Sequence, residues 1–208
     1  MSEEATAQEL FDAIGADYEA AFGRPPVVDA AVRDLLTTLP PGSRVLDIGS
    51  GTGRPVAEDL TAAGHHVTGL DVSGEMVRIA REQVPAAEFL HVDVRKWESA
   101  PDSWDAICAF FPFLQMTRAE TETVLGKIAG WLKPGGQFAL ITVPADIEDV
   151  PLEFLGHAVR LTSFAPDDLE QRVRAAGLEV TGTRSEIFEP GKPGAEPEEH
   201  LLITARKP

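Results

Sequence analysis

The strongest constraint on the fold is a short apolar strand that runs directly into a glycine-rich turn. Residues 44–53 read RVLDIGSGTG, with glycines at positions 49, 51 and 53. Glycine tolerates the positive φ angles of such a turn and leaves room for a ligand to approach the backbone closely. A second apolar run, HVTGLDV, ends on Asp71, where the hydroxyls of a ribose would lie. Together the two segments predict a nucleoside site.

The spacing of the glycines argues against other nucleotide-binding loops. A dinucleotide-binding turn of the form GxGxxG would need glycine at position 54, which holds Arg54. A phosphate-binding loop needs GxxxxGK followed by Ser or Thr, and the sequence contains no such run. The sequence therefore disfavours NAD, FAD and ATP sites of these types.

The GxGxG turn resembles the cofactor loop of class I S-adenosylmethionine-dependent methyltransferases. Further matches follow in the order typical of that family, and they extend the resemblance over most of the chain. They are Asp71 in GLDVS, Asp93 in AEFLHVDV, the apolar run WDAICAFF at residues 104–111 and LKPGG at residues 132–136. The resemblance implies S-adenosyl-L-methionine as cofactor and S-adenosyl-L-homocysteine as product.

The resemblance also implies an α/β, Rossmann-like class I fold. Such a fold has a seven-stranded, mostly parallel sheet with an antiparallel last strand and helices on both faces. The alternating helix and strand patterns of this chain agree with a parallel sheet. A length of 208 residues suits one domain, for which we expect an N-terminal helical lid at 1–40 and a substrate-side insert at 144–163.

Several residues are assigned to the cofactor by the resemblance alone. Asp71 would bind both ribose hydroxyls, Asp93 would accept a hydrogen bond from the adenine amine, and Val94 would receive the adenine ring. Tyr18 would reach the cofactor's carboxylate or else pack in the core, and Asp47 would bind the methionyl ammonium or else stiffen the loop. The complete expected set is Tyr18, Asp47, Gly49, Ser50, Gly51, Gly53, Asp71, Val72, Met76, Asp93, Val94 and Phe110.

The methyl acceptor is expected where the fourth strand leaves the sheet. Phe111, Phe113 and Met116 follow that strand and would form an apolar wall, with core packing as the equal alternative. His157, in the insert, is the candidate general base because an unperturbed histidine pKa is about 6.5, although a structural or solvated histidine is the alternative. His200, which opens the last strand, is a further histidine for the same cleft. Alignment alone also accelerates methyl transfer, so a base is not required.

Composition narrows the class of partner. The chain carries 34 acidic and 18 basic residues, for a net charge of −16, which disfavours nucleic acid and favours a neutral or cationic small molecule. The one cysteine, Cys108, has no partner for an internal disulfide, and its apolar surroundings predict a buried strand residue. Both points favour a reducing compartment. Because we find neither a signal peptide nor an apolar run of membrane-spanning length, we expect a cytoplasmic protein without a membrane partner. No His or Cys pair has metal-ligand spacing, so we expect no metal.

These observations predict an enzyme that moves a methyl group from S-adenosylmethionine to an O or N atom of a small molecule. A protein or nucleic-acid methyltransferase is an alternative that the acidity disfavours. Two others are an enzyme of the same fold that catalyses a non-methylating rearrangement and a non-catalytic S-adenosylmethionine-binding protein. Fold does not decide among these alternatives.

Overall fold

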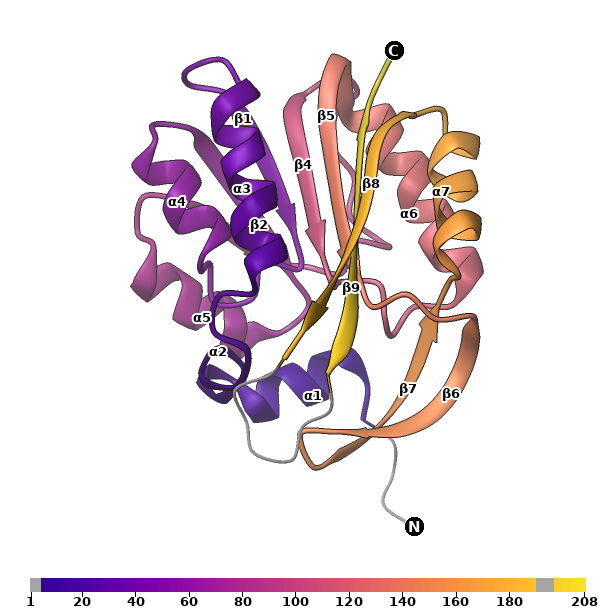
Figure 1. The fold of residues 1–208 in the computed structure, drawn as a ribbon. Coiled ribbons are helices and arrows are strands. Elements are labelled where there is room, and N and C mark those ends of the chain that lie inside the picture. Colours follow the sequence, from indigo (N-terminus) through magenta and orange to yellow (C-terminus); the bar gives the residue numbers. More distant parts are fainter. Residues whose placement is uncertain (1–4, 190–196) are drawn as a thin grey trace.

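A computed structural model describes residues 5–189 and 197–208. Its centre is a seven-stranded sheet with helices on both faces (Figure 1). The strands of this sheet are β1 (Arg44–Ile48), β2 (His66–Asp71), β3 (Glu88–His91), β4 (Trp104–Phe110), β5 (Leu132–Thr142), β8 (Glu179–Phe188) and β9 (Glu198–Arg206). The helices are α1 (Ala7–Ile14), α2 (Ala16–Phe22), α3 (Pro26–Thr38), α4 (Val56–Ala62), α5 (Gly74–Gln83), α6 (Arg118–Trp131) and α7 (Pro166–Ala175).

The strand order confirms the expected fold class. Across the sheet the order is β3-β2-β1-β4-β5-β9-β8, and β9 alone among these strands runs antiparallel to its two neighbours. The order turns back at β1, because β2 and β3 lie on one side of it and β4 and β5 on the other. In open α/β sheets, ligands bind at the carboxyl ends of the strands beside such a switch point.

Both faces of the sheet are buried, and neighbouring residues of one strand serve opposite cores. In β1, Val45 packs in the cluster formed with α3, α4 and α5, whereas Leu46 packs in the cluster formed with α6 and α7. Both side chains are fully buried. This is why the first strand reads as a continuous apolar run rather than an alternating one. The layered core fixes the carboxyl ends of the strands in place.

The N-terminal segment, expected to be helical, contains two short helices before α3. Gly15, with φ of +44°, interrupts it and separates α1 from α2. A capping box between Thr6 and Glu9 begins α1. The next helix, α3, packs on the sheet, whereas α1 and α2, which we call the lid helices, lie at the carboxyl edge.

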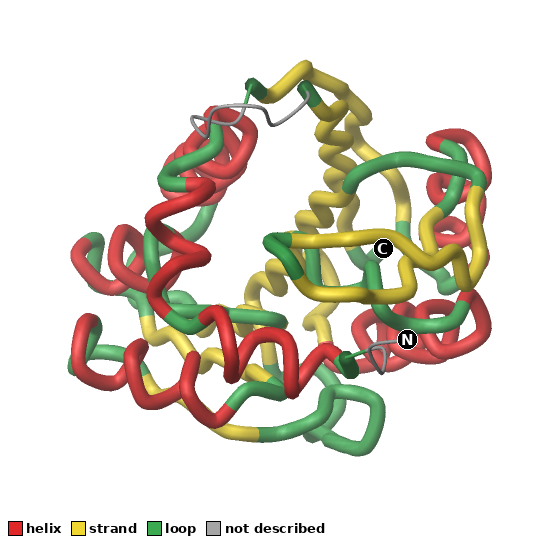
Figure 2. The backbone as a smooth tube through the Cα atoms, turned by 90° about the horizontal axis from the view of Figure 1, so that it is seen from below, coloured by secondary structure: helices red, strands yellow, loops and turns green. Residues whose placement is uncertain are grey.

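The insert at 144–163 forms a β-hairpin rather than an irregular loop. Its antiparallel strands are β6 (Ile147–Phe154) and β7 (His157–Ser163). The hairpin turns at Leu155 and Gly156, which have φ of +49° and +87°. Figure 2 shows the hairpin crossing the carboxyl edge of the sheet next to the N-terminal helix. A third apolar cluster joins the two, with Leu10 of α1 and Val159 of β7 both buried in it.

Two further observations concern Cys108 and the helices. Cys108 lies in β4, is completely buried, and has its thiol pKa raised by burial and then by the charge of Asp47. Within the two described stretches, none of the helices has both the length and the apolar character to cross a membrane.

Candidate cofactor and acceptor site

The carboxyl ends of β1, β2 and β4 open into a cavity of about 420 Å³, which α1, α2 and the hairpin cover. A volume of this size is typical of small-molecule sites. Most of the residues that the sequence predicts for cofactor and acceptor line it together. They are Tyr18, Gly49, Gly51, Asp71, Val72, Met76, Asp93, Val94, Phe110, Phe111 and Met116.

The three glycines of the turn have different surroundings. All have positive φ, at +72°, +51° and +80° for Gly49, Gly51 and Gly53. A Cβ on Gly49 would lie 2.7 Å from the Cβ of Pro112, so the turn packs against the segment after β4. A Cβ on Gly51 would meet no described atom within 4 Å, and Gly51 lines the cavity. Gly51 therefore offers bare backbone to a ligand.

Gly53 has a packing role instead. A Cβ there would lie 2.9 Å from the ring of Phe89 and 3.2 Å from Val84, and Gly53 does not line the cavity. The resemblance assigned Gly53 to the cofactor. In the structure, the absence of a side chain at Gly53 lets the turn pack closely against α5 and β3.

The carboxylate of Asp71 is held by backbone N–H groups from two segments, the glycine turn and the start of α5. Its Oδ2 accepts a 2.8 Å hydrogen bond from the N–H of Gly51, and its Oδ1 accepts one of 2.9 Å from the N–H of Ser73. Burial raises the pKa of Asp71, and the two N–H donors act against that increase. Each carboxylate oxygen keeps a further lone pair, so the group has the acceptors that a ribose diol requires.

Asp47 and Ser50 lie beneath the turn rather than on the cavity wall. Both are buried, and neither Asp47 Oδ2 nor Ser50 Oγ has a hydrogen-bond partner among the described residues. Burial, followed by the charge of Asp71, raises the pKa of Asp47 to about 7. An unpartnered buried carboxylate is costly. The site therefore fits a cationic group such as a methionyl ammonium.

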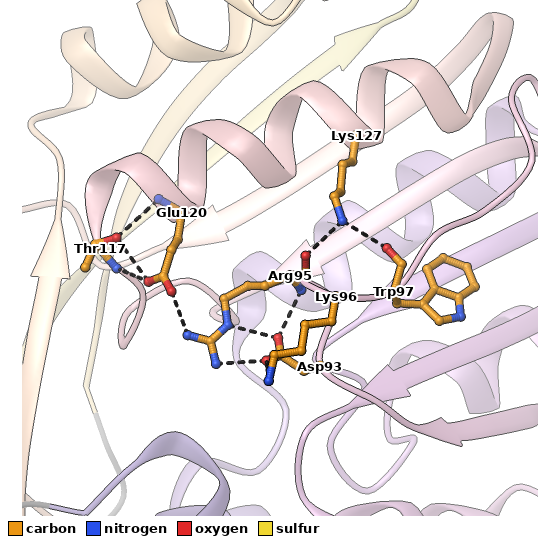
Figure 3. A network of polar contacts seen from close by, with 7 residues as sticks. All are labelled: Asp93, Arg95, Lys96, Trp97, Thr117, Glu120 and Lys127. Atoms are coloured by element: carbon orange, nitrogen blue, oxygen red, sulfur yellow. Dashed lines mark hydrogen bonds and ion pairs between the residues drawn. The ribbon is translucent and has the colours of Figure 1, made fainter.

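Asp93 belongs to a polar network that rests on α6 (Figure 3). Arg95 Nε donates to Asp93 Oδ1 at 2.9 Å and Arg95 Nη2 donates to Oδ2 at 3.0 Å, while Arg95 Nη1 donates to Glu120 Oε1 at 2.9 Å. These contacts lower the pKa of Asp93 against the opposing effect of burial, which is the largest single contribution. Asp93 therefore remains an ionised acceptor at the cavity wall.

Two residues predicted for the acceptor side lie elsewhere. Phe113 is buried in the core that faces α6 and does not line the cavity. His157 begins β7 beside the hairpin turn, and it lines a separate hollow with Asp17 and Ile14. The hairpin instead directs Asp149 and Arg160 to the cavity. The structure thus gives His157 no place from which to act as a general base in this cavity.

His200 packs against Phe111, which lines the cavity, but His200 itself does not line the cavity. It is 1% exposed, and its Nε2 donates to Glu198 Oε1 at 2.8 Å. Its ring lies 4.8 Å from those of both Phe111 and Phe188. The charge of Glu198, after burial, helps to raise the pKa of Tyr18 to about 12, so β9 faces the lid at this point.

Sequence reasoning missed part of the lining. The residues concerned come from α1 and the segment before it, from the ends of β1 and β2, from the segments after β3 and β4, and from the hairpin. They are Ala5, Thr6, Ala7, Phe11, Ile48, Leu70, Val92, Arg95, Pro112, Gln115, Asp149 and Arg160. Arg95 could have been identified from its position two residues after Asp93. Asp149 and Arg160 could not, because they reach the cavity through a hairpin that was not predicted.

Comparison with known proteins agrees with this geometry. Residues 45–136, which contain the glycine turn, Asp71 and Asp93, match a family model described as a methyltransferase domain. Residues 45–136 thus belong to the methyltransferase domain family, and the fold around them is that of the class I S-adenosylmethionine-dependent methyltransferases. Solved methyltransferase structures with the same Rossmann-like fold and antiparallel last strand are among its structural neighbours, so the domain match and the fold support each other.

The individual proteins to which this chain is similar differ in chemistry. It is 30% identical over 189 residues to the biotin biosynthesis bifunctional protein BioHC of Cellvibrio japonicus, covering 86% of this chain but only 37% of that protein. It is 27% identical to the O-methyltransferase cnsE of Penicillium expansum, covering 88% and 73% of the two chains. The solved [4+2]-cyclase SpnF has a TM-score of 0.73 at 22% identity, with 99% and 98% covered, which shows a shared fold.

Proposed function

We propose that this protein binds S-adenosylmethionine in the cavity and transfers its methyl group to an O or N atom of a small molecule. One observation carries the cofactor assignment. A buried carboxylate, Asp71, is fixed by the N–H groups of Gly51 and Ser73 directly beside the bare backbone of Gly51. This arrangement presents two fixed acceptors and an unobstructed turn to one ligand, as a ribose and its attached chain require.

The remaining cofactor residues follow from their places on the cavity wall. Asp93 would accept a hydrogen bond from the adenine amine, and Val94 and Val72, which line the same cavity, would contact the adenine ring. Asp47 would balance the methionyl ammonium from beneath the turn, and Tyr18 would close the site from the lid. The bound cofactor supplies an activated methyl group; this chain supplies orientation and the exclusion of water.

The acceptor side supports an apolar molecule with a polar end. Phe111, Pro112 and Met116 give an apolar wall, while Gln115 and the paired side chains of Asp149 and Arg160 give polar groups. Of the five histidines in the sequence, all of them in the described residues, none lines the cavity. We therefore assign rate acceleration to alignment of the acceptor rather than to a histidine base.

Charge and cysteine chemistry support the remaining parts of the proposal. The net charge of −16 opposes nucleic-acid phosphates, which favours a small-molecule acceptor. Cys108 is a free, buried thiol in a chain with no second cysteine, which suits a reducing compartment such as the cytoplasm.

Calorimetric titration with S-adenosylmethionine, S-adenosylhomocysteine and NAD⁺ tests the cofactor. We expect binding of the first two and none of NAD⁺. Asp71→Asn should weaken S-adenosylhomocysteine binding by about 10-fold or more, because one charged acceptor for the ribose becomes an amide. Glu58→Gln is the matched control. Glu58 lies on α4 in an exposed ion pair with Arg54, and the change should leave the affinity for S-adenosylhomocysteine unchanged. Binding of NAD⁺ alone would contradict the proposal.

A second candidate function is a rearrangement that uses the bound cofactor without consuming it. The fold similarity to a [4+2]-cyclase favours retaining it. Turnover assays with small acceptors distinguish the two functions, because methyl transfer releases one S-adenosylhomocysteine for each product. Product formation with no release of S-adenosylhomocysteine would replace methyl transfer by the rearrangement.

A further inference from the structure

We propose that Arg95 is a positioning residue that fixes the carboxylate of Asp93 and thereby makes the site select adenine over a base without a 6-amino group. The inference rests on the proposed binding of S-adenosylmethionine in the cavity. Asp93 and Arg95 both line that cavity, and they follow β3 on the side where the adenine would lie.

The first step is the geometry of the pair. Arg95 donates from Nε to Asp93 Oδ1 and from Nη2 to Oδ2, and its backbone N–H donates to Oδ1 at 3.0 Å. The guanidinium and carboxylate thus form a planar fork with two parallel hydrogen bonds. Rotation of the carboxylate would break both bonds of the fork, so its plane is fixed.

The second step is the number of acceptor positions left over. An ionised carboxylate has about four lone-pair positions. Two donors occupy those of Oδ1 and one donor occupies Oδ2, whereas Lys96 Nζ is 3.8 Å from Oδ2, beyond hydrogen-bond distance. One acceptor position therefore remains, on Oδ2.

A single acceptor with a fixed direction discriminates between base edges. The exocyclic amine of adenine donates a hydrogen bond to it, whereas the 6-oxo group of hypoxanthine brings an oxygen toward a carboxylate oxygen. Selectivity in such sites comes from the unfavourable contact as well as the favourable one. A carboxylate that rotated freely would avoid that contact more easily.

The third step is that Arg95 is itself held in place by α6 (Figure 3). Its Nη1 donates to Glu120 Oε1, and Glu120 Oε2 accepts from the N–H of Thr117 at 2.8 Å as part of the helix cap. Lys127 Nζ donates to the carbonyl oxygens of Arg95 and Trp97 at 2.9 and 3.1 Å. Support from a packed helix is what makes a positioning residue precise.

The test compares the dissociation constants of S-adenosylhomocysteine and S-inosylhomocysteine, which differ in the 6-substituent of the base and in the proton that hypoxanthine carries on the adjacent N1. Calorimetry on the wild-type chain should show a preference of about 10-fold or more for the adenine compound. Asp93→Asn should remove that preference. Arg95→Met should reduce it toward the Asp93→Asn value, and Arg95→Lys, which keeps the charge but cannot form the fork, should also reduce it.

The double variant decides whether Arg95 acts through Asp93. If it does, Arg95→Met combined with Asp93→Asn should show the same preference as Asp93→Asn alone. A further loss of S-adenosylhomocysteine affinity in the double variant, beyond that of Asp93→Asn alone, would mean that Arg95 contacts the cofactor directly, and this would overturn the positioning role.

Lys96→Met is the matched control, because it removes an equal charge from the neighbouring residue, whose side chain is 86% exposed. Its preference should equal that of the wild type, and thermal unfolding should show that all variants fold. A wild-type preference in both Arg95→Met and Arg95→Lys would overturn the inference. Failure of the wild-type chain to bind S-adenosylhomocysteine would instead overturn the proposed function.

Discussion

The hydroxyl of Ser73 donates a 2.6 Å hydrogen bond to Asp12 Oδ1, and this bond joins the lid helix α1 to the N-terminus of α5. The same Asp12 oxygen accepts from the N–H of Glu75 at 3.2 Å, and Ser73 also caps α5 by accepting from the N–H of Met76. Because Met76 lines the cavity and Asp71 accepts a hydrogen bond from the N–H of Ser73, one short segment connects the lid helices to the proposed ribose-binding carboxylate.

Asp12→Ala should therefore loosen the lid. Loss of a charge-assisted hydrogen bond at a part-buried position costs roughly 1–2 kcal/mol in the free energy of unfolding. The hydrogen bond from Ser73 also lowers the pKa of Asp12. The contribution of this bond to the free energy of unfolding is therefore present at neutral pH and is lost as pH falls through the lowered pKa. Hydrogen exchange in residues 7–14 measures the opening. Asp17→Ala, an exposed change on α2, is the control, and equal exchange in both variants would contradict the prediction.

Gly51→Ala and Gly53→Ala should separate cofactor binding from stability. Both changes strain a positive φ, but only the Cβ at Gly53 also meets a packed ring, that of Phe89. We expect Gly53→Ala to lower the melting temperature more, and Gly51→Ala to lower S-adenosylhomocysteine affinity more. Differential scanning calorimetry and titration on both variants check this, and the reverse order would refute the division of roles.

Asp47 should couple cofactor binding to proton release. Its folded pKa of about 7 exceeds the unfolded value of about 3.9, so burial of this group destabilises the fold increasingly as pH rises from 4 through 7. A cationic ligand group stabilises the ionised form and lowers that pKa. Titrations near pH 6.5 in buffers of different ionisation enthalpy should show protons released on S-adenosylmethionine binding. Asp47→Asn should abolish most of this release, and equal release in both proteins would contradict the assignment.

Phe22 should control how long the lid stays closed. Its ring lies 4.9 Å from that of Tyr18 and stacks on Phe154 of the hairpin at 5.7 Å, so it bridges the lid and the hairpin. Each such ring pair contributes about 0.5–1.5 kcal/mol beyond burial. Phe22→Ala should increase the dissociation rate of S-adenosylhomocysteine severalfold in stopped-flow measurements. Ile187→Ala, at a 66% exposed position on β8, should leave the rate unchanged; an unchanged rate in Phe22→Ala would exclude a bridging role.

The sequence predicted the part of the fold in which local pattern and tertiary structure require the same residues. The apolar run of β1, the glycine turn and the acidic residue ending β2 each have a physical requirement that shows in the residues themselves. The distinction between Gly51 and Gly53 was not visible, because both satisfy the turn and only the position of Phe89 separates them. His157 was misplaced for a similar reason, since its role depended on the direction of a hairpin.

The hairpin itself escaped prediction because its strands are half-exposed and follow no strict alternation. Its turn at Leu155 and Gly156 uses a non-glycine residue with positive φ, which a sequence pattern does not indicate. Asp149 and Arg160 therefore entered the site only with the structure. The hydrogen bond between Arg95 and Glu120 was likewise not predictable, because it requires the loop after β3 to lie beside the start of α6. In the sequence these two segments are separated by β4 and its connecting segments.

The complete burial of Cys108 makes this protein a ready background for site-directed labelling. Its thiol lies inside β4 with a raised pKa, so maleimide reagents have little thiolate to attack while the chain is folded. A cysteine introduced at an exposed position of α2 and another on the hairpin would thus be the reactive sites, and a dye pair attached there would report the distance between lid and hairpin during turnover. Labelling of Cys108 itself would then signal global unfolding, which gives every such experiment an internal check.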